Sequence, residues 1–357
     1  MSAHATAPEL TPLSNLDDAW MIGSAGPRLR AVRGAAERLR DVMGAAPRVL
    51  AVRTLPLATL LYPTKYAFWG AAVSPAPYVM MTHRCLLVQF LQRGELKHLL
   101  FNPSDVIAAR NTPYFRYMAD LLGEYLSFEV LTRRFDPLET QLSNLGLRPE
   151  HIDYIAFDHF HTQDLRPLLG TTDGTPARFP RARLLAPEVE WLAWDDLHPL
   201  QRSWFQADGK RNLRTENVVL TRGDLELGAG VWIIRTHGHT VGNQTLFVNT
   251  ESGLWGSSEN GTSADSYSPH DSGIPGLRMA CRQKDVDVVL NTNTPEWMAD
   301  QYTSMVLERT LVDRVKGAPS FVQMFPSSEV TPSRLAPGIR PTMVHGEIRS
   351  GALASPG

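Results

Sequence analysis

Two histidines stand two residues apart at the end of a short apolar segment, and this pattern constrains the fold more than any other. The segment, residues 154–157, is rich in β-forming side chains, and His159 and His161 follow it. Residues i and i+2 of an extended chain point to the same side, so both imidazoles can be directed at one point. Neutral imidazole is the commonest transition-metal ligand in proteins. The pattern predicts a metal-facing strand end, with a partly exposed turn after a buried strand as the alternative.

Length and composition are those of a globular protein with a large core. The chain has 357 residues, of which 43% are hydrophobic and 20% charged. A formal charge of −2 without a basic stripe predicts no nucleic-acid partner. We see no apolar run long enough to span a bilayer and no signal-peptide pattern, so we expect a cytoplasmic protein without membrane association. Cys85 and Cys281 adjoin apolar runs and are expected to be buried free thiols.

Strands are expected in two antiparallel groups, one before residue 102 and one after residue 217, with helices after each. The first group covers residues 49–62, 78–90 and 96–101, with a hairpin turn at Arg93-Gly94. The second covers residues 218–220, 225–227, 231–235, 245–248 and 254–256. Further strands are expected at 154–157, 183–186 and 286–290, and helices at 114–122, 138–144, 187–197 and 298–314. This order predicts a layered α/β protein with sheet in the middle and helices outside.

Residues 27–44 form a separate amphipathic pattern, with apolar side chains at helical spacing between arginines and acids. Proline suits the first turn of a helix, so one helix is expected here. Its arginine-rich face is expected to be solvated rather than to lie on a membrane surface. Its apolar face would suit the core or a partner subunit, which makes a homodimer possible.

A second histidine cluster supplies a family resemblance. The stretch Thr236-His237-Gly238-His239-Thr240 follows a predicted strand and contains a glycine that permits a tight turn. Together with the His159/His161 stretch, it resembles the metallo-β-lactamase-fold superfamily, and in detail its lactonase-like hydrolases. That family has an αββα sandwich, an H-x-H-x-D-H loop and a later T-P-G-H-T-x-G-H loop at the same edge. The resemblance implies an N-terminal extension over residues 1–48, a sandwich domain over 49–330, and a C-terminal arm over 331–357.

The resemblance also implies a set of metal ligands. The first metal position of the family falls on His159, His161 and His239. Its second position normally uses the Asp and final His of the first motif, a bridging Asp and a last His. In this chain those four places are taken by Gln163, Asp164, Glu259 and Asn293, with Asn291 the less suited alternative to Asn293.

These departures predict one tightly held metal rather than two. Three imidazoles with the Glu259 carboxylate would suit one divalent zinc or iron ion, or manganese. The second position offers only oxygen donors, and two of them, Gln163 and Asn293, are neutral amides. It is therefore expected to be empty, weak, or occupied by a hard cation.

Asp164 and Asp158 near the predicted ligands have two open interpretations each. Asp164 would orient the nucleophile as a catalytic carboxylate, or would bond the backbone of its own turn. Asp158 would hold a ligand imidazole from behind, or would be an ordinary carboxylate at a strand end. His237 stands where the family has proline, and it is expected outside the ligand set.

The resemblance implies an enzyme acting on a small-molecule substrate. The leading hypothesis is a metal-dependent hydrolase in which a metal-bound hydroxide attacks an ester, lactone or thioester carbonyl. One alternative is a non-heme iron oxygenase or dioxygenase on the same fold. The other alternative is a non-catalytic ligand-binding member of the superfamily.

Overall fold

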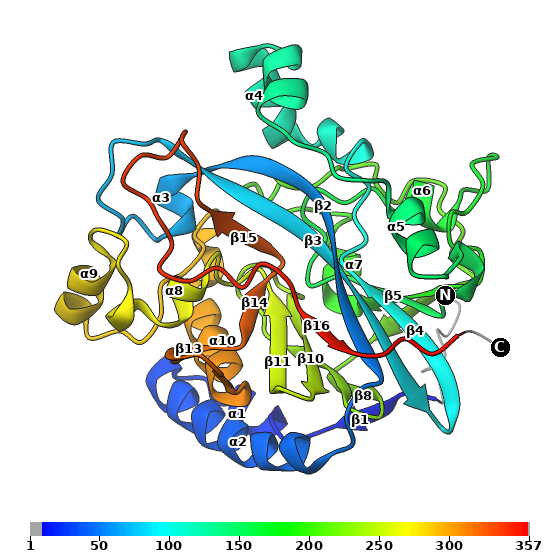
Figure 1. The fold of residues 1–357 in the computed structure, drawn as a ribbon, viewed down its shortest axis with the longest axis horizontal. Coiled ribbons are helices and arrows are strands. Elements are labelled where there is room, and N and C mark those ends of the chain that lie inside the picture. Colours follow the sequence, from blue (N-terminus) through cyan, green and yellow to red (C-terminus); the bar gives the residue numbers. More distant parts are fainter. Residues whose placement is uncertain (1–8, 356–357) are drawn as a thin grey trace.

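Two β-sheets pack face to face, and helices cover the outer face of each sheet (Figure 1). The computed structural model describes residues 9–355, so residues 1–8 and 356–357 of the predicted terminal segments lie outside the described chain. The hairpin at Arg93-Gly94 is confirmed, with positive φ at both residues.

The larger sheet contains most of the strands from the first half of the chain. In spatial order they are β16 (Arg349–Gly351), β2 (Ala51–Pro63), β3 (Tyr78–Gln92), β4 (Glu95–Phe101), β5 (Tyr154–Ala156), β6 (Arg183–Pro187) and β7 (Val218–Thr221), and β15 (Ser328–Thr331) also pairs with β3. The antiparallel group predicted before residue 102 is confirmed, because β2, β3 and β4 pair antiparallel. β4 to β7 pair in parallel, so the prediction is wrong for β7, which was placed in the antiparallel group after residue 217. β7 also belongs to this sheet rather than to the later group.

The smaller sheet is formed mainly by the strands after residue 223. Its order is β1 (Thr11–Leu13), β8 (Asp224–Gly228), β9 (Val231–Arg235), β10 (Gln244–Thr250), β11 (Gly253–Ser258) and β14 (Met324–Pro326). β12 (Arg314–Val315) and β13 (Ala318–Val322) form a separate antiparallel pair. Only the pair of β11 and β14 is parallel in the smaller sheet as described.

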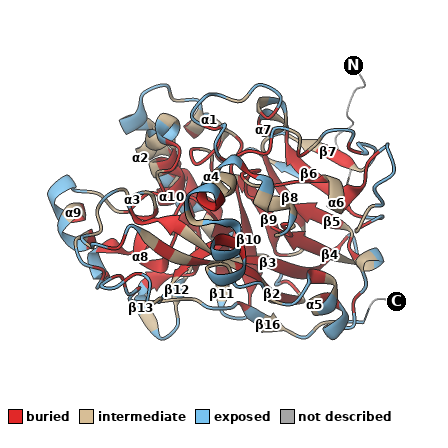
Figure 2. Cartoon of the chain, turned by 90° about the horizontal axis from the view of Figure 1, so that it is seen from above, coloured by how far each residue is buried: buried red, intermediate tan, exposed pale blue. Residues whose placement is uncertain are grey.

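Alternating side chains show that both faces of the smaller sheet are buried (Figure 2). On β9, Val231 and Ile233 point into the core between the sheets. Trp232 and Ile234 point the other way, into a core shared with helices. A strand with apolar residues on both sides needs a layer against each face, since each face removes apolar surface from water. The larger sheet has the same arrangement, so the predicted αββα sandwich is confirmed.

The helices occupy both outer layers and one end of the sandwich. Over the smaller sheet lie α1 (Asp17–Trp20), α2 (Ala25–Ala45) and α10 (Met298–Leu311). Along the larger sheet lie α5 (Leu138–Asn144), α6 (Arg166–Leu169) and α7 (Glu188–Ala193). The remaining helices are α3 (Thr64–Ala67), α4 (Pro113–Leu122), α8 (Ala264–Tyr267) and α9 (Leu277–Lys284), with short turns at η1 (Ala108–Asn111), η2 (Leu126–Val130), η3 (Pro149–His151), η4 (Pro269–Asp271) and η5 (Pro295–Trp297).

The amphipathic N-terminal helix is part of the sandwich. α2 packs its apolar face on α10 and the smaller sheet. Its arginine-rich face is used in ion pairs: Arg28–Asp300, Arg33–Asp287 and Arg40–Asp313. β16 in turn joins the C-terminal segment to β2. The domain boundaries near residues 48 and 330 stay predictions, because both terminal segments pack on the sandwich.

Two further features are the absence of a membrane-spanning helix among the described residues and the state of the two cysteines. Within residues 9–355, no helix combines the length and apolar character needed to cross a membrane. Cys85 and Cys281 are both free and buried, as expected.

One predicted strand is wrong. Residues 286–290 form no strand, although residues 288–290 are buried. The backbone N–H of Val289 donates to the carbonyl of Ser266, and that of Asn291 donates to the carbonyl of Asn260. This apolar run is therefore an extended segment held by loops.

Candidate metal centre

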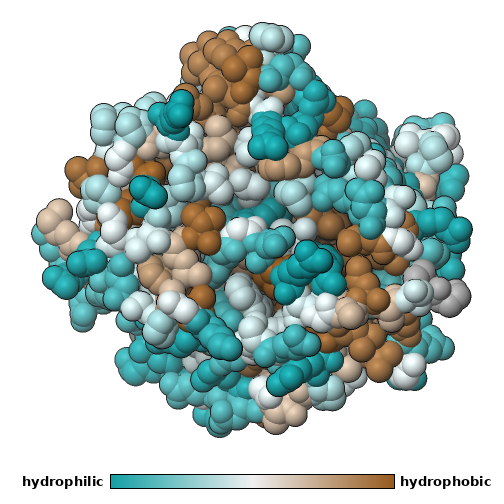
Figure 3. Space-filling view, in the orientation of Figure 1, coloured by the Kyte–Doolittle hydropathy of each residue, from teal (hydrophilic) through white to brown (hydrophobic). Residues whose placement is uncertain are grey.

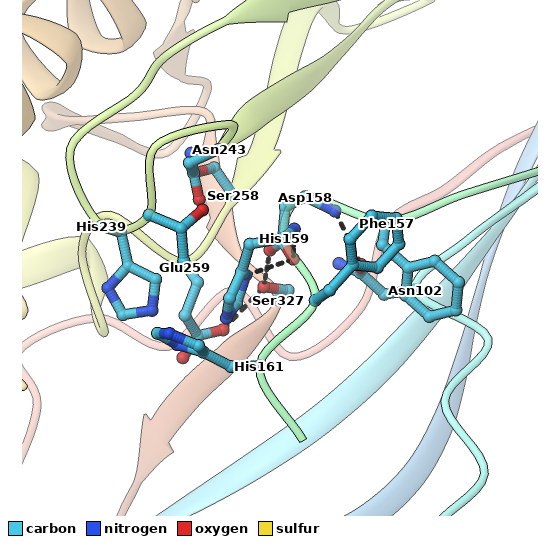
Figure 4. A network of polar contacts seen from close by, with 12 residues as sticks. Asn102, Phe157, Asp158, His159, His161, His239, Asn243, Ser258, Glu259 and Ser327 are labelled. Atoms are coloured by element: carbon cyan, nitrogen blue, oxygen red, sulfur yellow. Dashed lines mark hydrogen bonds and ion pairs between the residues drawn. The ribbon is translucent and has the colours of Figure 1, made fainter. Parts of the chain in front are cut away.

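Three histidines from two separate loops meet at one edge of the sandwich (Figure 4). His159 and His161 follow β5, and His239 lies in the loop between β9 and β10. One nitrogen from each ring lies within 4.8 Å of the others. The centre of the His159 ring is 4.7 Å from that of His161 and 4.5 Å from that of His239. The structure thus brings together the three histidines that the sequence singled out, two from a loop of the larger sheet and one from a loop of the smaller sheet.

Two glycines let the His239 loop pack against neighbouring helices. Gly238 has a φ of +140°, and a Cβ there would lie 2.2 Å from the backbone nitrogen of Gln301 on α10. A Cβ on Gly242 would lie 2.5 Å from the Cβ of Glu190 on α7. Only glycine permits both the backbone conformation and these close approaches. The loop position that presents His239 is therefore set by backbone contacts.

The buried carboxylate of Glu190 ties the two histidine loops together. Its Oε1 accepts a hydrogen bond from the Phe160 N–H at 2.6 Å, between the first two histidines. Its Oε2 accepts from the Gly242 N–H at 3.0 Å and from the Thr240 hydroxyl, in the loop of His239. Burial raises the pKa of Glu190, while the charge of His159 and these donors act in the opposite direction. One side chain therefore sets the distance between the loops.

Asp158 fixes the orientation of His159. The Oδ1 atom of Asp158 lies 2.7 Å from Nδ1 of His159, and Ser327 donates to the other carboxylate oxygen. Burial alone would lower the pKa of His159, but the adjacent carboxylate raises it. With Nδ1 bonded to Asp158, Nε2 is the nitrogen that faces the other two histidines. This is the arrangement of a carboxylate holding a metal-binding imidazole.

Gln201 and Glu296 fix the orientation of His161. The Nε2 amide of Gln201 donates to Oε1 of Glu296 at 2.5 Å, so the Gln201 oxygen must face the histidine. That oxygen lies 2.6 Å from Nε2 of His161 and accepts its proton. The other ring nitrogen, Nδ1, is then left with a free lone pair.

Two buried nitrogens in this cluster have no hydrogen-bond partner among residues 9–355. They are Nδ1 of His161 and Nδ1 of His239. Burial, and next the charge of His159, hold the pKa of both imidazoles well below the usual range, so both rings are neutral. Buried polar atoms are normally hydrogen-bonded, and neutral imidazole is a good ligand for zinc or iron. The residues present therefore fit a divalent transition metal.

Glu259, the predicted fourth ligand, is near the histidines but outside the group of mutually close ligand atoms. Its Oε2 lies 2.7 Å from the Ser327 hydroxyl, whose single proton Glu259 shares with Asp158 (Figure 4). The same oxygen accepts from the Ser328 N–H at 2.8 Å. Burial, with a smaller effect from Asp158, raises the pKa of Glu259 to about 7. Its role as a ligand stays a prediction.

Gln163 and Asn293 face the same pocket as the histidines. Asn291 also lines it, but its Oδ1 accepts the Tyr62 hydroxyl at 2.5 Å and its amide donates to the Glu259 carbonyl. Of the two asparagines considered for the second position, Asn293 is therefore the one with an uncommitted side chain.

Asp164 and His237 are not brought to the pocket. Asp164 is in an ion pair with Arg166, whose Nε and Nη2 lie 2.8 Å and 2.6 Å from its two oxygens. The Arg166 N–H also donates to Asp164, which closes a local turn. His237 packs on Trp20 at the end of α1, with the two ring centres 4.3 Å apart. The geometry gives no support to a catalytic role for Asp164.

The histidines lie at the base of a pocket with about 980 Å³ of open space, including solvent at its mouth. Its walls are mostly apolar and come from the ends of β2 and β3, from residues 104–115, and from Phe128 and Trp204. Tyr114 stacks on Trp204 with ring centres 4.6 Å apart, and Trp204 is 6.1 Å from His161. Of the tryptophans at positions 191, 194 and 204, only Trp204 lines this pocket.

The segment of α4 and η2 covers one side of the pocket and projects from the body of the molecule (Figure 1). Its outer surface exposes Tyr117, Leu121, Tyr125 and Val130. Figure 3 shows hydrophobic side chains gathered at this end of the molecule. The sequence predicted the α4 helix but not its position over the site.

Sequence reasoning missed Glu190, Gln201 and Ser327, and it favoured a structural or surface role for His83, a fourth residue of the site. His83 lines the pocket, with its ring nitrogens 2.9 Å from the Ser104 hydroxyl and 3.0 Å from the Ser328 hydroxyl. Burial lowers the pKa of His83 to about 4. All four come from elements distant in the chain, so no local spacing marked them.

The chain has the arrangement of the metallo-β-lactamase fold. Its αββα sandwich carries an H-x-H loop and a later histidine loop, and the two loops meet at one edge.

No protein-family model and no curated protein matches the chain. Among solved structures, it is similar to a quorum-quenching N-acyl homoserine lactone lactonase at 18% identity, with a TM-score of 0.45 over 67% of this chain and 88% of that chain. It is similar to a probable metal-dependent hydrolase from Staphylococcus aureus at 13% identity, with a TM-score of 0.47 over 67% and 84%. A third is AidC, a dizinc quorum-quenching lactonase, at 13% identity, with a TM-score of 0.42 over 66% and 81%. All three TM-scores are below 0.5, and the fold is defined by the two sheets and the two histidine loops of this chain.

Replacing Gln201 with leucine is expected to weaken metal binding about 10- to 100-fold, the usual effect of removing a residue that orients a metal-binding histidine. The Nε2 proton of His161 would lose its acceptor, and the ring would be free to turn Nδ1 away. Competition with a chromogenic chelator measures the affinity. Gln283→Leu, an exposed glutamine on α9, is the matched control and should leave it unchanged. Equal affinities in both variants would contradict the assigned orientation of His161.

Proposed function

We propose that this protein is a metal-dependent hydrolase that cleaves an uncharged ester, lactone or thioester. The observation that carries the proposal is the pair of buried, unpartnered Nδ1 atoms of His161 and His239, which lie beside His159 at the base of a largely apolar pocket. When bound, a divalent metal polarises a carbonyl oxygen and lowers the pKa of a water molecule.

The surrounding residues hold the histidine rings in fixed orientations. Asp158 and the Gln201–Glu296 pair set the ring orientations of His159 and His161. Preorganised ligands of this kind avoid reorganisation during the reaction. The walls are mostly apolar, and a low local dielectric strengthens electrostatic interactions inside the pocket.

The charges of the pocket favour an uncharged substrate. Arg110 is the single lysine or arginine among the described lining residues, and its Nη2 donates to Glu129 at 3.0 Å. Asp158 and Glu259 add negative charge near the histidines. An anionic substrate would therefore find no free cation on the protein wall, whereas an apolar ester or lactone loses little on leaving water.

A substrate panel together with metal analysis tests the proposal. The panel consists of a γ-lactone, an aryl ester and a thioester, each with a short and a long alkyl chain. We expect about one equivalent of zinc or iron in protein purified without added metal. We also expect turnover of at least one panel member, lost on chelation and restored by metal.

The other outcomes identify the competing functions. A metal-loaded protein inert on the whole panel would contradict the proposal. Oxygen consumption after reconstitution with Fe(II) would favour an iron oxygenase. Tight binding of panel members without turnover, unaffected by chelation, would favour a non-catalytic binding protein.

A further inference from the structure

A groove lined by arginines lies at the edge of the larger sheet, outside the histidine pocket. It is bounded by residues 53–56 of β2, residues 133–136, part of α5 and residues 347–349. It holds about 1060 Å³ of open space, including solvent at its mouth, and none of its lining residues also lines the histidine pocket. Four arginines and two carboxylates line it, at positions 53, 133, 134 and 349 and at positions 136 and 347. The groove is therefore a separate candidate site with an excess of positive charge.

Arg53 and Arg349 are placed directly opposite each other on two paired strands. β16 and β2 pair antiparallel, and their register sets Arg349 against Arg53. Residues that are directly opposite lie on the same face of a sheet, and two like charges in these positions are destabilising. Burial, and next the charge of Arg349, lower the pKa of Arg53, whereas Glu347 acts in the opposite direction. A bound anion would relieve this repulsion.

The guanidinium of Arg53 is held in place by neutral groups. Its Nη1 donates to the carbonyls of Val52 at 2.8 Å and Ser350 at 2.7 Å, and its Nη2 donates to the carbonyl of Gly351 at 2.9 Å. These oxygens fix the orientation of the group but do not compensate its charge. A guanidinium has five N–H donors, so two of them remain for a ligand. Arg53 is therefore preorganised for an oxyanion.

Arg133 adds a third guanidinium from another part of the chain. Its N–H donates to the hydroxyl of Thr59 at 2.9 Å, and its carbonyl accepts from the Thr59 N–H at 2.8 Å. Its side chain lies over the ring of Phe135, 4.8 Å from the ring centre. Both the backbone and the side chain of Arg133 are thus held in place by contacts that leave its charge uncompensated.

Carboxylates do not neutralise these three arginines. Arg134 is the arginine of the groove that has an ion pair, with its Nη2 2.8 Å from Oε2 of Glu129. Within residues 9–355, no carboxylate lies at ion-pair distance from Arg53, Arg133 or Arg349, and the two carboxylates that line the groove form no ion pair. The three guanidinium groups are therefore available to an anion.

The donor set and the shape of the groove select the class of ligand. Guanidinium groups bind phosphate through paired, charge-assisted hydrogen bonds. A phosphate dianion can compensate two like charges at once, whereas a single carboxylate or sulfonate carries only one charge. The arginines lie in one bounded groove rather than along a basic stripe, which suits a small molecule better than a nucleic acid or a membrane surface.

We propose that Arg53, Arg133 and Arg349 form a binding site for a phosphate group, carried by free phosphate or by a small phosphomonoester. The site does not depend on the proposed hydrolase function, because the groove and the histidine pocket have no lining residue in common.

Calorimetric titration at constant ionic strength tests the site. The probes are inorganic phosphate, glycerol 3-phosphate and methanesulfonate, each titrated before and after chelation of the protein. We expect one-to-one binding of both phosphates with a Kd of about 1 mM or lower, unchanged by chelation, and binding of methanesulfonate at least about tenfold weaker. Tighter binding of glycerol 3-phosphate than of inorganic phosphate would identify a phosphomonoester as the ligand, and the reverse order would identify free phosphate.

Two variants each remove one guanidinium group. Arg349→Gln and Arg133→Gln should each weaken phosphate binding about tenfold, the effect of losing a hydrogen bond to a charged group. Arg282→Gln, an exposed arginine on α9, is the matched control and should bind phosphate as the wild type does. Without phosphate, Arg349→Gln should unfold in urea at the wild-type midpoint or above it, because the repulsion of Arg53 is removed.

The other outcomes overturn the site or separate it from the proposed function. Absence of phosphate binding in the wild type, or binding that survives both variants, overturns it. Loss of binding on chelation also overturns it, because the phosphate would then lie on the metal. Binding of a DNA duplex or of phosphatidylglycerol vesicles, lost in both variants and without binding of either small phosphate, overturns it in favour of a macromolecular surface. Phosphate binding by a protein inert on the whole ester panel supports the site and contradicts only the hydrolase.

Discussion

Replacing His161 with alanine is expected to remove the metal and abolish hydrolysis. His161 supplies one of the two buried nitrogens without a protein partner, and its ring lies 4.7 Å and 4.9 Å from those of His159 and His239. The variant would lose one of three imidazole ligands, and the two that remain would hold the metal much less tightly. Loss of the metal's stabilisation of transition-state charge, about 4 kcal/mol, corresponds to at least a thousandfold loss in kcat/KM.

The measurements are metal content by elemental analysis and turnover of the best panel substrate. His270→Ala is the matched control, because His270 is exposed and bonds only the Val286 carbonyl. It should retain about one equivalent of metal and full activity. Full metal content and activity in His161→Ala would show that the histidine cluster is structural.

Local patterns were sufficient to predict the elements that position these ligands. The i, i+2 spacing of His159 and His161 has a direct structural meaning, because an extended chain directs both rings to one side. The glycines around His239 likewise predicted a tight turn, and Gly238 does adopt a φ open mainly to glycine. Geometry of this kind depends only on residues that are adjacent in the sequence, so the sequence alone predicts it.

Strand pairing depended on distant residues and was predicted less well. β4 and β5 are separated by residues 102–153, which contain α4 and α5. A connection of that length permits parallel pairing, and the sequence pattern predicted no partner for β5 or β6. The buried run at residues 288–290 could be read as a strand, since periodicity cannot distinguish a strand from a buried extended segment.

Side-chain direction limited the prediction of the site. Asp164 follows the motif closely in sequence, yet Arg166 two residues later captures its carboxylate. Asp158, in contrast, directs its carboxylate toward His159 and Ser327. Gln201 and Glu190 reach the histidines from the segment after β6, so their roles depended on tertiary packing that no spacing encodes.

Replacing Glu190 with alanine is expected to lower the free energy of unfolding by about 3–5 kcal/mol. The carboxylate accepts from Phe160, Thr240 and Gly242, and hydrogen bonds to a charged group contribute about 1.5–3 kcal/mol each. Its loss would leave the N–H groups of Phe160 and Gly242 buried without acceptors. The free energy of unfolding of Glu190→Gln should lie between those of the wild type and Glu190→Ala. One end of the glutamine amide can still accept from the Phe160 N–H, whereas the other end is a donor.

Urea unfolding of the metal-free protein measures this loss separately from metal binding. Glu188→Ala, on the same helix, is the control: Glu188 pairs with Arg222 at the surface, where solvent screens the interaction and its loss should change stability little. Metal affinity should also fall in Glu190→Ala, because the loops of His161 and His239 would no longer be held at a set distance. An unfolding midpoint equal to that of Glu188→Ala would show that the loops keep their positions without this carboxylate, and that the backbone contacts of Gly238 and Gly242 are sufficient.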